Sequence, residues 1–218
     1  VLPTPIARLR AEFPKVNVSL HQGNPNQVAQ MLIDETAEIG IATESLADYT
    51  ELVTLPCYEW QHVLVLPIAH PLGQKEHLTL EDIAQEPLIT YHPAYTGRTR
   101  IDQAFATRKL APRIALEAID SDVIKTYAES GLGIGIVAAM AYDADKDADL
   151  VALDASHLFA SSVTRIGCRR GTFLRGYMYE FMQLFAPHLT KERVVAAFEA
   201  VDQSAVDQVF SELVLPLR

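Results

Sequence analysis

Two apolar stretches of strand length, separated by a short polar step, stand out in residues 52–72. The polar step covers residues 58–62, and the second stretch ends in Pro67-Ile-Ala-His-Pro-Leu72. Short apolar runs closed by proline are typical of buried strands rather than helices. No turn dipeptide separates the two stretches, so the pattern predicts that the chain leaves one sheet here and enters another. A ligand would then bind where the two halves of the fold meet.

Helical and strand patterns alternate along the rest of the chain. Helical spacing covers residues 5–13, 26–34, 80–85, 100–109, 123–130 and 173–185, with two further helical patterns in 190–218. Strand patterns cover residues 16–20, 37–43, 88–91, 113–118, 134–137 and 163–168. This alternation predicts an α/β protein with mostly parallel sheets and right-handed crossovers. We expect two lobes joined by a hinge of two crossover strands, with lobe I formed by residues 1–57 and 163–218 and lobe II by 58–162.

Composition and charge exclude several classes of protein for this chain. The chain has a net charge of −10, and its short basic clusters do not form the basic stripe that DNA binding requires. Cys57 and Cys168 lie in apolar strand-like segments, which predicts buried thiols and a reducing compartment. No apolar run reaches the ~20 residues of a membrane span, and the first residues lack the features of a signal peptide. These features predict a cytoplasmic protein that does not bind DNA through this polypeptide alone.

The sequence lacks the motifs of common catalytic and metal sites. It contains no G-x-S-x-G, H-E-x-x-H or P-loop pattern, and its seven histidines have no ligand spacing. Gly131-Leu-Gly133-Ile-Gly135 follows a predicted helix and opens a strand, whereas a dinucleotide fingerprint follows a strand and opens a helix. We therefore expect neither an enzyme nor a metal or nucleotide cofactor.

Two loops are candidates for binding a small anion. Residues 23–26, with Asn24, and residues 95–99, with Thr96 and Gly97, each follow a strand and precede a helix, where backbone N–H groups favour an anion. The alternative is that Asn24 and Thr96 only cap their helices. Thr43 lies at the end of a predicted strand, and its hydroxyl group is explained either as a ligand contact or as a cap. Trp60, the only tryptophan, is explained equally well as a packed hinge residue or as a wall of the binding site.

A set of longer motifs identifies a family. The general pattern consists of Pro67-x-x-His70-Pro71-Leu72, Ala37-Glu-Ile-Gly-Ile-Ala42 and the glycine-rich passage within residues 123–137. On these residues the chain resembles the effector-binding domain of LysR-type transcriptional regulators. Within that family it is most similar to the activators of cysteine biosynthesis and sulfonate use, through His21-Gln-Gly-Asn-Pro25, Leu55-Pro-Cys-Tyr-Glu-Trp60, Tyr95-Thr-Gly-Arg98, Asp122-Val-Ile-Lys-Thr-Tyr127, Thr172-Phe-Leu-Arg-Gly-Tyr-Met-Tyr179 and Phe185-Ala-Pro-His-Leu189.

The resemblance implies a fold, a ligand and partners. It implies a two-lobed receptor domain of the type II periplasmic-binding fold that responds to N-acetylserine or O-acetylserine, with sulfate or thiosulfate in the cleft. Thr43 and Thr96 match anion-contacting threonines of the family, and Trp60 matches a position linked to inducer response. The full-length regulators bind DNA through an N-terminal helix-turn-helix and assemble as homodimers or homotetramers.

The chain also departs from the family pattern, and other classes remain open. It begins at the first helix, so the DNA-binding head and the first strand of the receptor domain are absent, and we expect an incomplete first sheet. A transport receptor for an oxyanion would share the fold but carry an export signal. A small α/β transferase or hydrolase would need a catalytic residue set that this sequence does not offer. The motifs do not separate the cysteine-regulon activator from its sulfonate-regulating relative.

Overall fold

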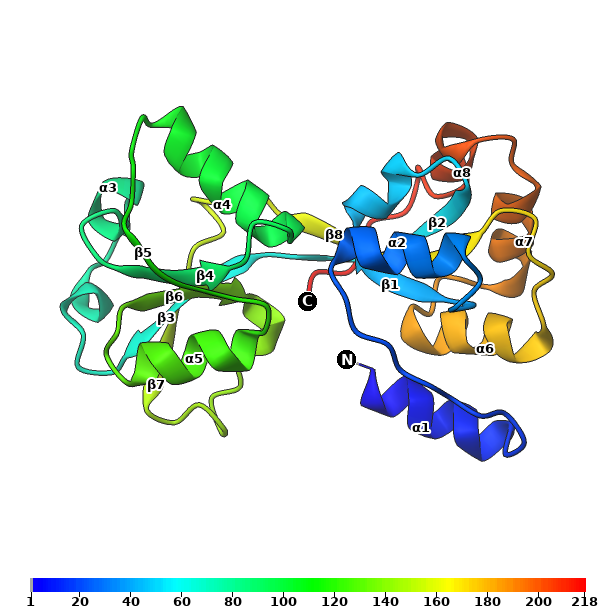
Figure 1. The fold of residues 1–218 in the computed structure, drawn as a ribbon, viewed down its shortest axis with the longest axis horizontal. Coiled ribbons are helices and arrows are strands. Elements are labelled where there is room, and N and C mark those ends of the chain that lie inside the picture. Colours follow the sequence, from blue (N-terminus) through cyan, green and yellow to red (C-terminus); the bar gives the residue numbers. More distant parts are fainter. Residues whose placement is uncertain (1) are drawn as a thin grey trace. The chain divides into compact units, whose positions relative to one another are not determined.

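The structure, a computed structural model, describes residues 2–218 and divides the chain into two compact units (Figure 1). Among the described residues, unit 1 comprises residues 2–59 and 163–216, and unit 2 comprises Trp60–Ser162 and Leu217–Arg218. The chain therefore enters unit 2 after Glu59 and returns to unit 1 at Val163.

Unit 1 is built on a three-stranded sheet with the strand order β1-β8-β2. Strand β1 pairs antiparallel with β8, and helix α2 packs closely on β1, since a Cβ atom at Gly40 would lie only 2.7 Å from Val28 Cγ1. Ala29 and Leu32 of this helix share a buried core cluster with Leu52. The elements of the unit are α1 (Pro3–Glu12), α2 (Pro25–Ile33), β1 (Gly40–Thr43), the 3-10 helix η1 (Glu44–Asp48), β2 (Leu52–Trp60), β8 (Ser162–Arg169), α6 (Gly176–Phe185), α7 (Lys191–Glu199) and α8 (Gln203–Val209).

Unit 2 contains a five-stranded sheet with the order β5-β4-β6-β3-β7. Helices α4 and α5 cover opposite faces of this sheet (Figure 1): Ile101 and Phe105 of α4 pack with Leu64, whereas Ile124 of α5 packs with Val65. The elements are β3 (His62–Pro67), η2 (Pro71–Gln74), α3 (Leu80–Ile83), β4 (Leu88–Tyr91), α4 (Thr96–Thr107), β5 (Ile114–Ala118), α5 (Ser121–Glu129), β6 (Ile134–Ala138), η3 (Ala139–Ala141) and β7 (Leu150–Asp154).

The predicted helix starts are confirmed in their hydrogen bonds. The side chain of Asn24 accepts a hydrogen bond from the Gln27 N–H at 3.0 Å, and the Gln27 side chain accepts one from the Asn24 N–H at 2.9 Å. Thr79 and Asp82 form the same reciprocal pair at the start of α3. Such caps satisfy N–H groups that the first helical turn leaves without acceptors.

Several boundaries differ from the sequence prediction, and one strand was not predicted. The helix expected at residues 100–109 starts a turn earlier, at Thr96, so Thr96 and Gly97 are helical rather than part of a loop. Strands β2 and β3 extend into the polar step, and Gln61 alone separates them. Strand β7 was not predicted, because its segment lies among acidic residues that mask its short apolar pattern.

The expectation of mostly parallel sheets was wrong. Strand β4 pairs parallel with β5 and β6, but β3 pairs antiparallel with β6 and β7, and β1 pairs antiparallel with β8. A parallel pair needs a long crossover connection, usually a helix. Strand β3 enters its sheet directly from β2 without such a connection, so the α/β alternation did not determine its direction.

The strand predicted at residues 16–20 does not form. This segment has an irregular backbone and belongs to neither sheet, and Val18 and Leu20 are 38% and 71% exposed. Alternating apolar residues favour a strand only where a neighbouring strand supplies hydrogen-bonding partners. Within the described residues no strand of either sheet pairs with this segment, so its alternating pattern lacks the hydrogen-bonding partners of a sheet.

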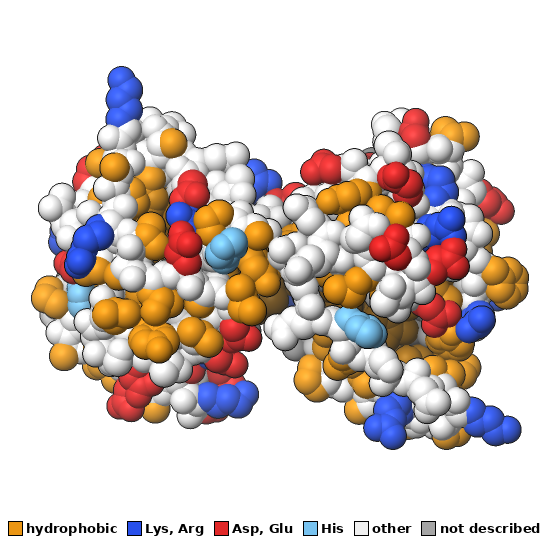
Figure 2. Space-filling model, viewed as in Figure 1, with side chains coloured by type: hydrophobic (Ala, Val, Ile, Leu, Met, Phe, Trp, Pro, Cys, Tyr) orange, Lys and Arg blue, Asp and Glu red, His pale blue; other side chains and the backbone are white. Residues whose placement is uncertain are grey.

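The two thiols and the surface charges follow the expected pattern. Cys57 and Cys168 are both buried, and neither forms a disulfide within residues 2–218. On the face shown in Figure 2, Lys and Arg side chains are dispersed among Asp and Glu rather than forming a continuous strip. None of the helices in the described chain is both long enough and apolar enough to cross a membrane.

Candidate functional site

The first turn of α4 is the candidate site in unit 2. Thr96 is the first residue of the helix, and the preceding residue, Tyr95, makes no capping hydrogen bond with its side chain. The N–H groups of Arg98 and Thr99 reach the Tyr95 carbonyl oxygen at 3.0 and 3.4 Å. The helix itself provides no acceptor for the N–H groups that precede them, and the helix dipole places partial positive charge there. This end of α4 is therefore suited to an anionic group.

Three aromatic side chains converge on Gly97 at this helix start. A Cβ atom at Gly97 would lie 3.3 Å from His62 Nε2, 3.3 Å from Tyr91 Cδ2 and 3.4 Å from Trp60 Cη2. Trp60 is 7% exposed and His62 is fully buried, with their ring centroids 5.0 Å apart. Because glycine has no side chain, the backbone of the helix start can lie directly against these rings. We call Trp60, His62, Tyr91, Thr96 and Gly97 the α4-start site.

The ring of Tyr91 is held in position by its hydroxyl group. That group accepts a hydrogen bond from the Ala138 N–H at 3.0 Å and lies 2.9 Å from Ser121 Oγ. Burial raises the pKa of Tyr91, and the hydrogen bond to Ser121 offsets only part of this effect. The phenol therefore stays neutral, and β6 and α5 together fix one wall of the site.

A buried hydroxyl group lies on the face of the sheet that α4 covers. Thr90 is fully buried, and its Oγ1 has no hydrogen-bond partner among the described residues. It shares its face of β4 with Leu88, which packs in the same core cluster as Ile101 of α4. A buried hydroxyl without a partner costs ~1–3 kcal/mol, so such groups in native proteins indicate a water, a ligand or a mechanistic role.

The nearby cation adds no positive charge to the site. Arg98 is 8% exposed, its Nε donates to Asp102 at 2.7 Å, and one terminal nitrogen donates to Glu117 at 2.6 Å. Burial lowers the pKa of Arg98, but the hydrogen bonds to both carboxylates outweigh burial and raise it. Since two carboxylates neutralise this guanidinium, an anion at the helix start would be held by hydroxyl and N–H donors.

The remaining predicted residues lie in unit 1. Thr43 is half-buried at the end of β1, with its Oγ1 3.3 Å from Ser45 Oγ. Asn24 is engaged in the capping box of α2, so its side chain already has the hydrogen bonds of a helix cap. Of the five predicted ligand contacts, the structure brings Trp60, Thr96 and Gly97 together in unit 2.

Sequence reasoning missed the role of His62. In the sequence it counts only as one of seven histidines without ligand spacing, whereas in the structure its ring lies between Trp60 and Phe159, with centroids 5.0 and 5.6 Å away. The available signal was its position in a strand, two residues before the buried Leu64. Residues two apart in a strand face the same side, so its burial could have been predicted.

The glycines of the passage at residues 131–135 have packing and helix-ending roles in the fold. Gly131 has a φ of +78° just after α5 and ends that helix. A Cβ at Gly133 would overlap the carbonyl oxygen of Pro87, and one at Gly135 would lie 2.6 Å from Val65 Cγ2. Within residues 2–218, no group of His, Cys, Asp and Glu side chains is arranged to hold a metal ion.

Comparisons with known proteins agree on one family. Residues 1–190 match the model of the LysR substrate binding domain. The chain is 52% identical over 193 residues to the HTH-type transcriptional regulator SsuR of Burkholderia cenocepacia, which covers 88% of this chain and 63% of that protein. It is 47% identical over 203 residues to the regulator CysB of the same organism, which covers 93% of this chain and 65% of that protein.

A solved structure matches in three dimensions as well. The cofactor-binding domain of the Cbl transcriptional regulator is similar with a TM-score of 0.85 and 43% sequence identity, over 91% of this chain and 88% of that one. The chain thus matches nearly all of an isolated regulatory domain, but it spans less than two thirds of the length of the two curated relatives.

Proposed function

The chain belongs to the LysR family of transcriptional regulators through its substrate-binding domain, and we propose that it senses the effector of an activator controlling sulfur assimilation and cysteine biosynthesis. The fold is the two-lobed receptor fold of that family, which is regulatory rather than enzymatic. In the full-length regulator, DNA would be bound by an N-terminal helix-turn-helix and not by this domain.

The proposed effector is N-acetylserine or O-acetylserine, with sulfate or thiosulfate as competing anions. The single observation that carries this proposal is the α4-start site, where Gly97 brings the helix start against a buried aromatic wall. The ligand carboxylate or oxyanion would accept hydrogen bonds from Thr96 and the first-turn N–H groups, and Trp60 would line its apolar part. Hydrogen bonds to a charged group contribute ~1.5–3 kcal/mol each, so three of them correspond to millimolar to micromolar affinity.

Effector binding would act by shifting a conformational equilibrium of the regulator. A ligand changes the populations only if it binds one arrangement more tightly than the other. We propose a homodimer or homotetramer in which α1 and α5 contribute the subunit contacts. The exposure of Val123 and Tyr127 on α5, at 41% and 43%, supports this choice of surface.

A thermal-shift titration at constant ionic strength tests the proposed function. The panel contains sulfate, thiosulfate, N-acetylserine and O-acetylserine, with chloride and serine as controls. A ligand present at 100 times its dissociation constant should stabilise the folded state by ~2.7 kcal/mol, which is a measurable rise in melting temperature. A selective, saturable rise for one acetylserine supports the proposal, and equal responses to all anions, or none, contradict it.

The contribution of unit 1 is tested separately. We propose that Thr43 also contacts the effector, whereas Asn24 serves mainly as a cap. Thr43→Ala should weaken binding about tenfold in calorimetry, the loss expected for one hydrogen bond to a charged group. Thr43→Ser keeps the hydroxyl and should bind as the parent chain does. Unchanged affinity in Thr43→Ala would remove this residue from the site.

A further inference from the structure

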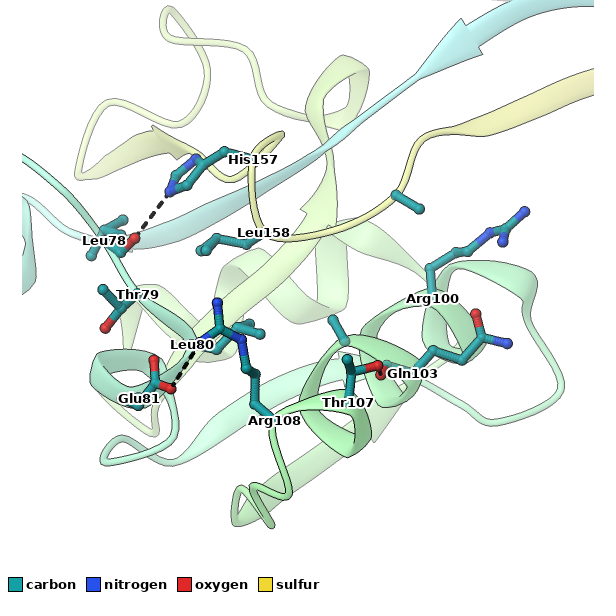
Figure 3. Close-up of a pocket in the computed structure, with 12 residues that line it drawn as sticks. Leu78, Thr79, Leu80, Glu81, Arg100, Gln103, Thr107, Arg108, His157 and Leu158 are labelled. Carbon is teal, nitrogen blue, oxygen red and sulfur yellow. Dashed lines mark hydrogen bonds and ion pairs between the residues drawn. The ribbon is translucent and has the colours of Figure 1, made fainter.

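A second cavity lies wholly within unit 2, away from the first turn of α4. It has a volume of about 550 Å³ and lies between α3, the C-terminal half of α4 and the loop that follows β7 (Figure 3). Small-molecule sites typically occupy 300–1,000 Å³. Its lining combines an apolar floor that includes Leu78, Leu80 and Leu158 with a charged rim that includes Glu81, Arg100 and Arg108. We call it the α3–α4 cavity.

The floor of the α3–α4 cavity is apolar and firmly held. Leu78 and Leu80 are each 7% exposed and belong to the main core of unit 2, against which Ala104 and Leu158 also pack. The Leu78 carbonyl lies 3.0 Å from His157 Nε2, which ties the loop after β7 to the start of α3 (Figure 3). An aliphatic group placed on this floor would be removed from water without rearranging the core.

The rim of the cavity carries a guanidinium that retains hydrogen-bonding capacity. Arg108 lies 3.8 Å from the Glu81 carboxylate, and these side chains are 64% and 53% exposed. That separation is too long for a hydrogen bond, whereas a charge-assisted N–H to carboxylate bond is ~2.7–2.9 Å long. A carboxylate that enters the cavity could therefore bind Arg108 more closely than Glu81 does.

The charge balance of the lining favours an anion over a cation. The lining includes Arg100 of α4 and Arg108, which directly follows the last residue of that helix, whereas Glu81 is the only acidic residue in the lining. The chain as a whole has a net charge of −10, so a lining with more basic than acidic side chains differs from the average of the chain. The neutral side chains of Gln103 and Thr107 lie on α4 between the two arginines and provide further polar contacts.

We infer that the α3–α4 cavity binds a small amphipathic carboxylate, with its aliphatic part on Leu78, Leu80 and Leu158 and its carboxylate on Arg108. The closed floor and the size of the cavity suit a compact molecule. This site is separate from the proposed effector site at Thr96, so an experiment that rejects one of the two sites does not reject the other.

Hexanoate is a suitable probe because it combines a carboxylate with a short aliphatic chain. We would titrate it into the full chain labelled at its methyl groups and follow the resonances of Ala104 and Leu158 by NMR. Acetate lacks the aliphatic part, hexanol lacks the charge, and hexylamine reverses it. Hexanoate should bind at least several-fold more tightly than any of these three, and the indole N–H signal of Trp60 should not move.

Two substitutions on the rim should have opposite effects. Arg108→Gln should weaken hexanoate binding about tenfold, the loss expected for a hydrogen bond to a charged group. Glu81→Gln should strengthen binding, because it removes the carboxylate that competes for Arg108. A general loss of folding would weaken binding in both variants, so the opposite signs distinguish the site from a structural effect.

A blocking variant and a matched control complete the test. Thr107→Trp introduces a large side chain from an exposed position in the lining and should abolish the methyl shifts, whereas Arg113→Gln removes an exposed arginine outside the lining and should leave them unchanged. The inference is overturned if hexanol binds as well as hexanoate, if no probe shifts these methyl groups, or if Arg108→Gln binds hexanoate as the parent chain does.

Discussion

Replacing Gly97 by valine tests whether the close packing at the α4-start site exists as described. A Cβ atom added at this position would lie 3.3–3.4 Å from atoms of His62, Tyr91 and Trp60, and valine adds two methyl groups beyond that atom. Overpacking of this kind costs ~1–3 kcal/mol, and valine is no worse than glycine in a helix, so propensity does not explain a loss. We expect unfolding in urea to show a loss of ~2 kcal/mol, near the middle of that range.

The same experiment has an internal reporter and a matched control. Trp60 is the only tryptophan, so its fluorescence and near-UV circular dichroism should change in Gly97→Val. Gly176 begins α6 in a comparable position, but a Cβ there meets nothing within 4 Å. Gly176→Val should therefore stay within ~0.5 kcal/mol of the parent. Equal stability of the two variants, with an unchanged Trp60 spectrum, would refute the packing described at Gly97.

Three further predictions concern packing and charge in the two units. Gly133→Ala should destabilise the chain by ~2–3 kcal/mol in urea unfolding, because the new methyl group overlaps the backbone of Pro87; wild-type stability would contradict it. Lys125→Met should cost ~3 kcal/mol, the lower end of the range for removing one partner of a buried ion pair, because the pair with Asp147 at 2.9 Å is largely buried. Burial lowers the pKa of Lys125, but the hydrogen bonds and charges of Asp147 and Asp122 together outweigh burial and raise it. This stabilisation should therefore be complete below about pH 10 and lost as the pH rises through the folded-state pKa. A pH-independent difference in stability between Lys125→Met and the parent up to pH 11 would disagree. Burial raises the pKa of the Cys168 thiol to about 12, so iodoacetamide at pH 8 should modify this residue only in urea; rapid labelling of the folded chain would show that the thiol is accessible.

Local signals in the sequence were sufficient for most helices and for their caps. Asn24 and Thr79 could be placed because a capping residue, its partner three positions later and the following apolar pattern are adjacent in the chain. The buried strands around residues 52–67 were found for the same reason, since each is a short apolar run with clear ends. The family motifs then supplied the fold.

Features that depend on distant parts of the chain could not be predicted in this way. The direction of β3 depends on its partners β6 and β7, which are about seventy to ninety residues away. The start of α4 was placed too late because Tyr95 makes no capping hydrogen bond and Gly97 disfavours a helix locally. Packing against Trp60 and His62 offsets that preference, and only the folded structure brings those rings to Gly97.

Calorimetry of Thr96→Ala and Thr96→Ser, with the acetylserine that stabilises the parent chain, tests the proposed effector site most directly. Both variants keep a residue that fits the first position of α4, but only serine keeps the hydroxyl. We predict that Thr96→Ala binds about tenfold more weakly, as expected for one hydrogen bond to a charged group, and that Thr96→Ser binds like the parent. Equal affinity of the parent chain and Thr96→Ala would contradict the assignment of the effector to the start of α4.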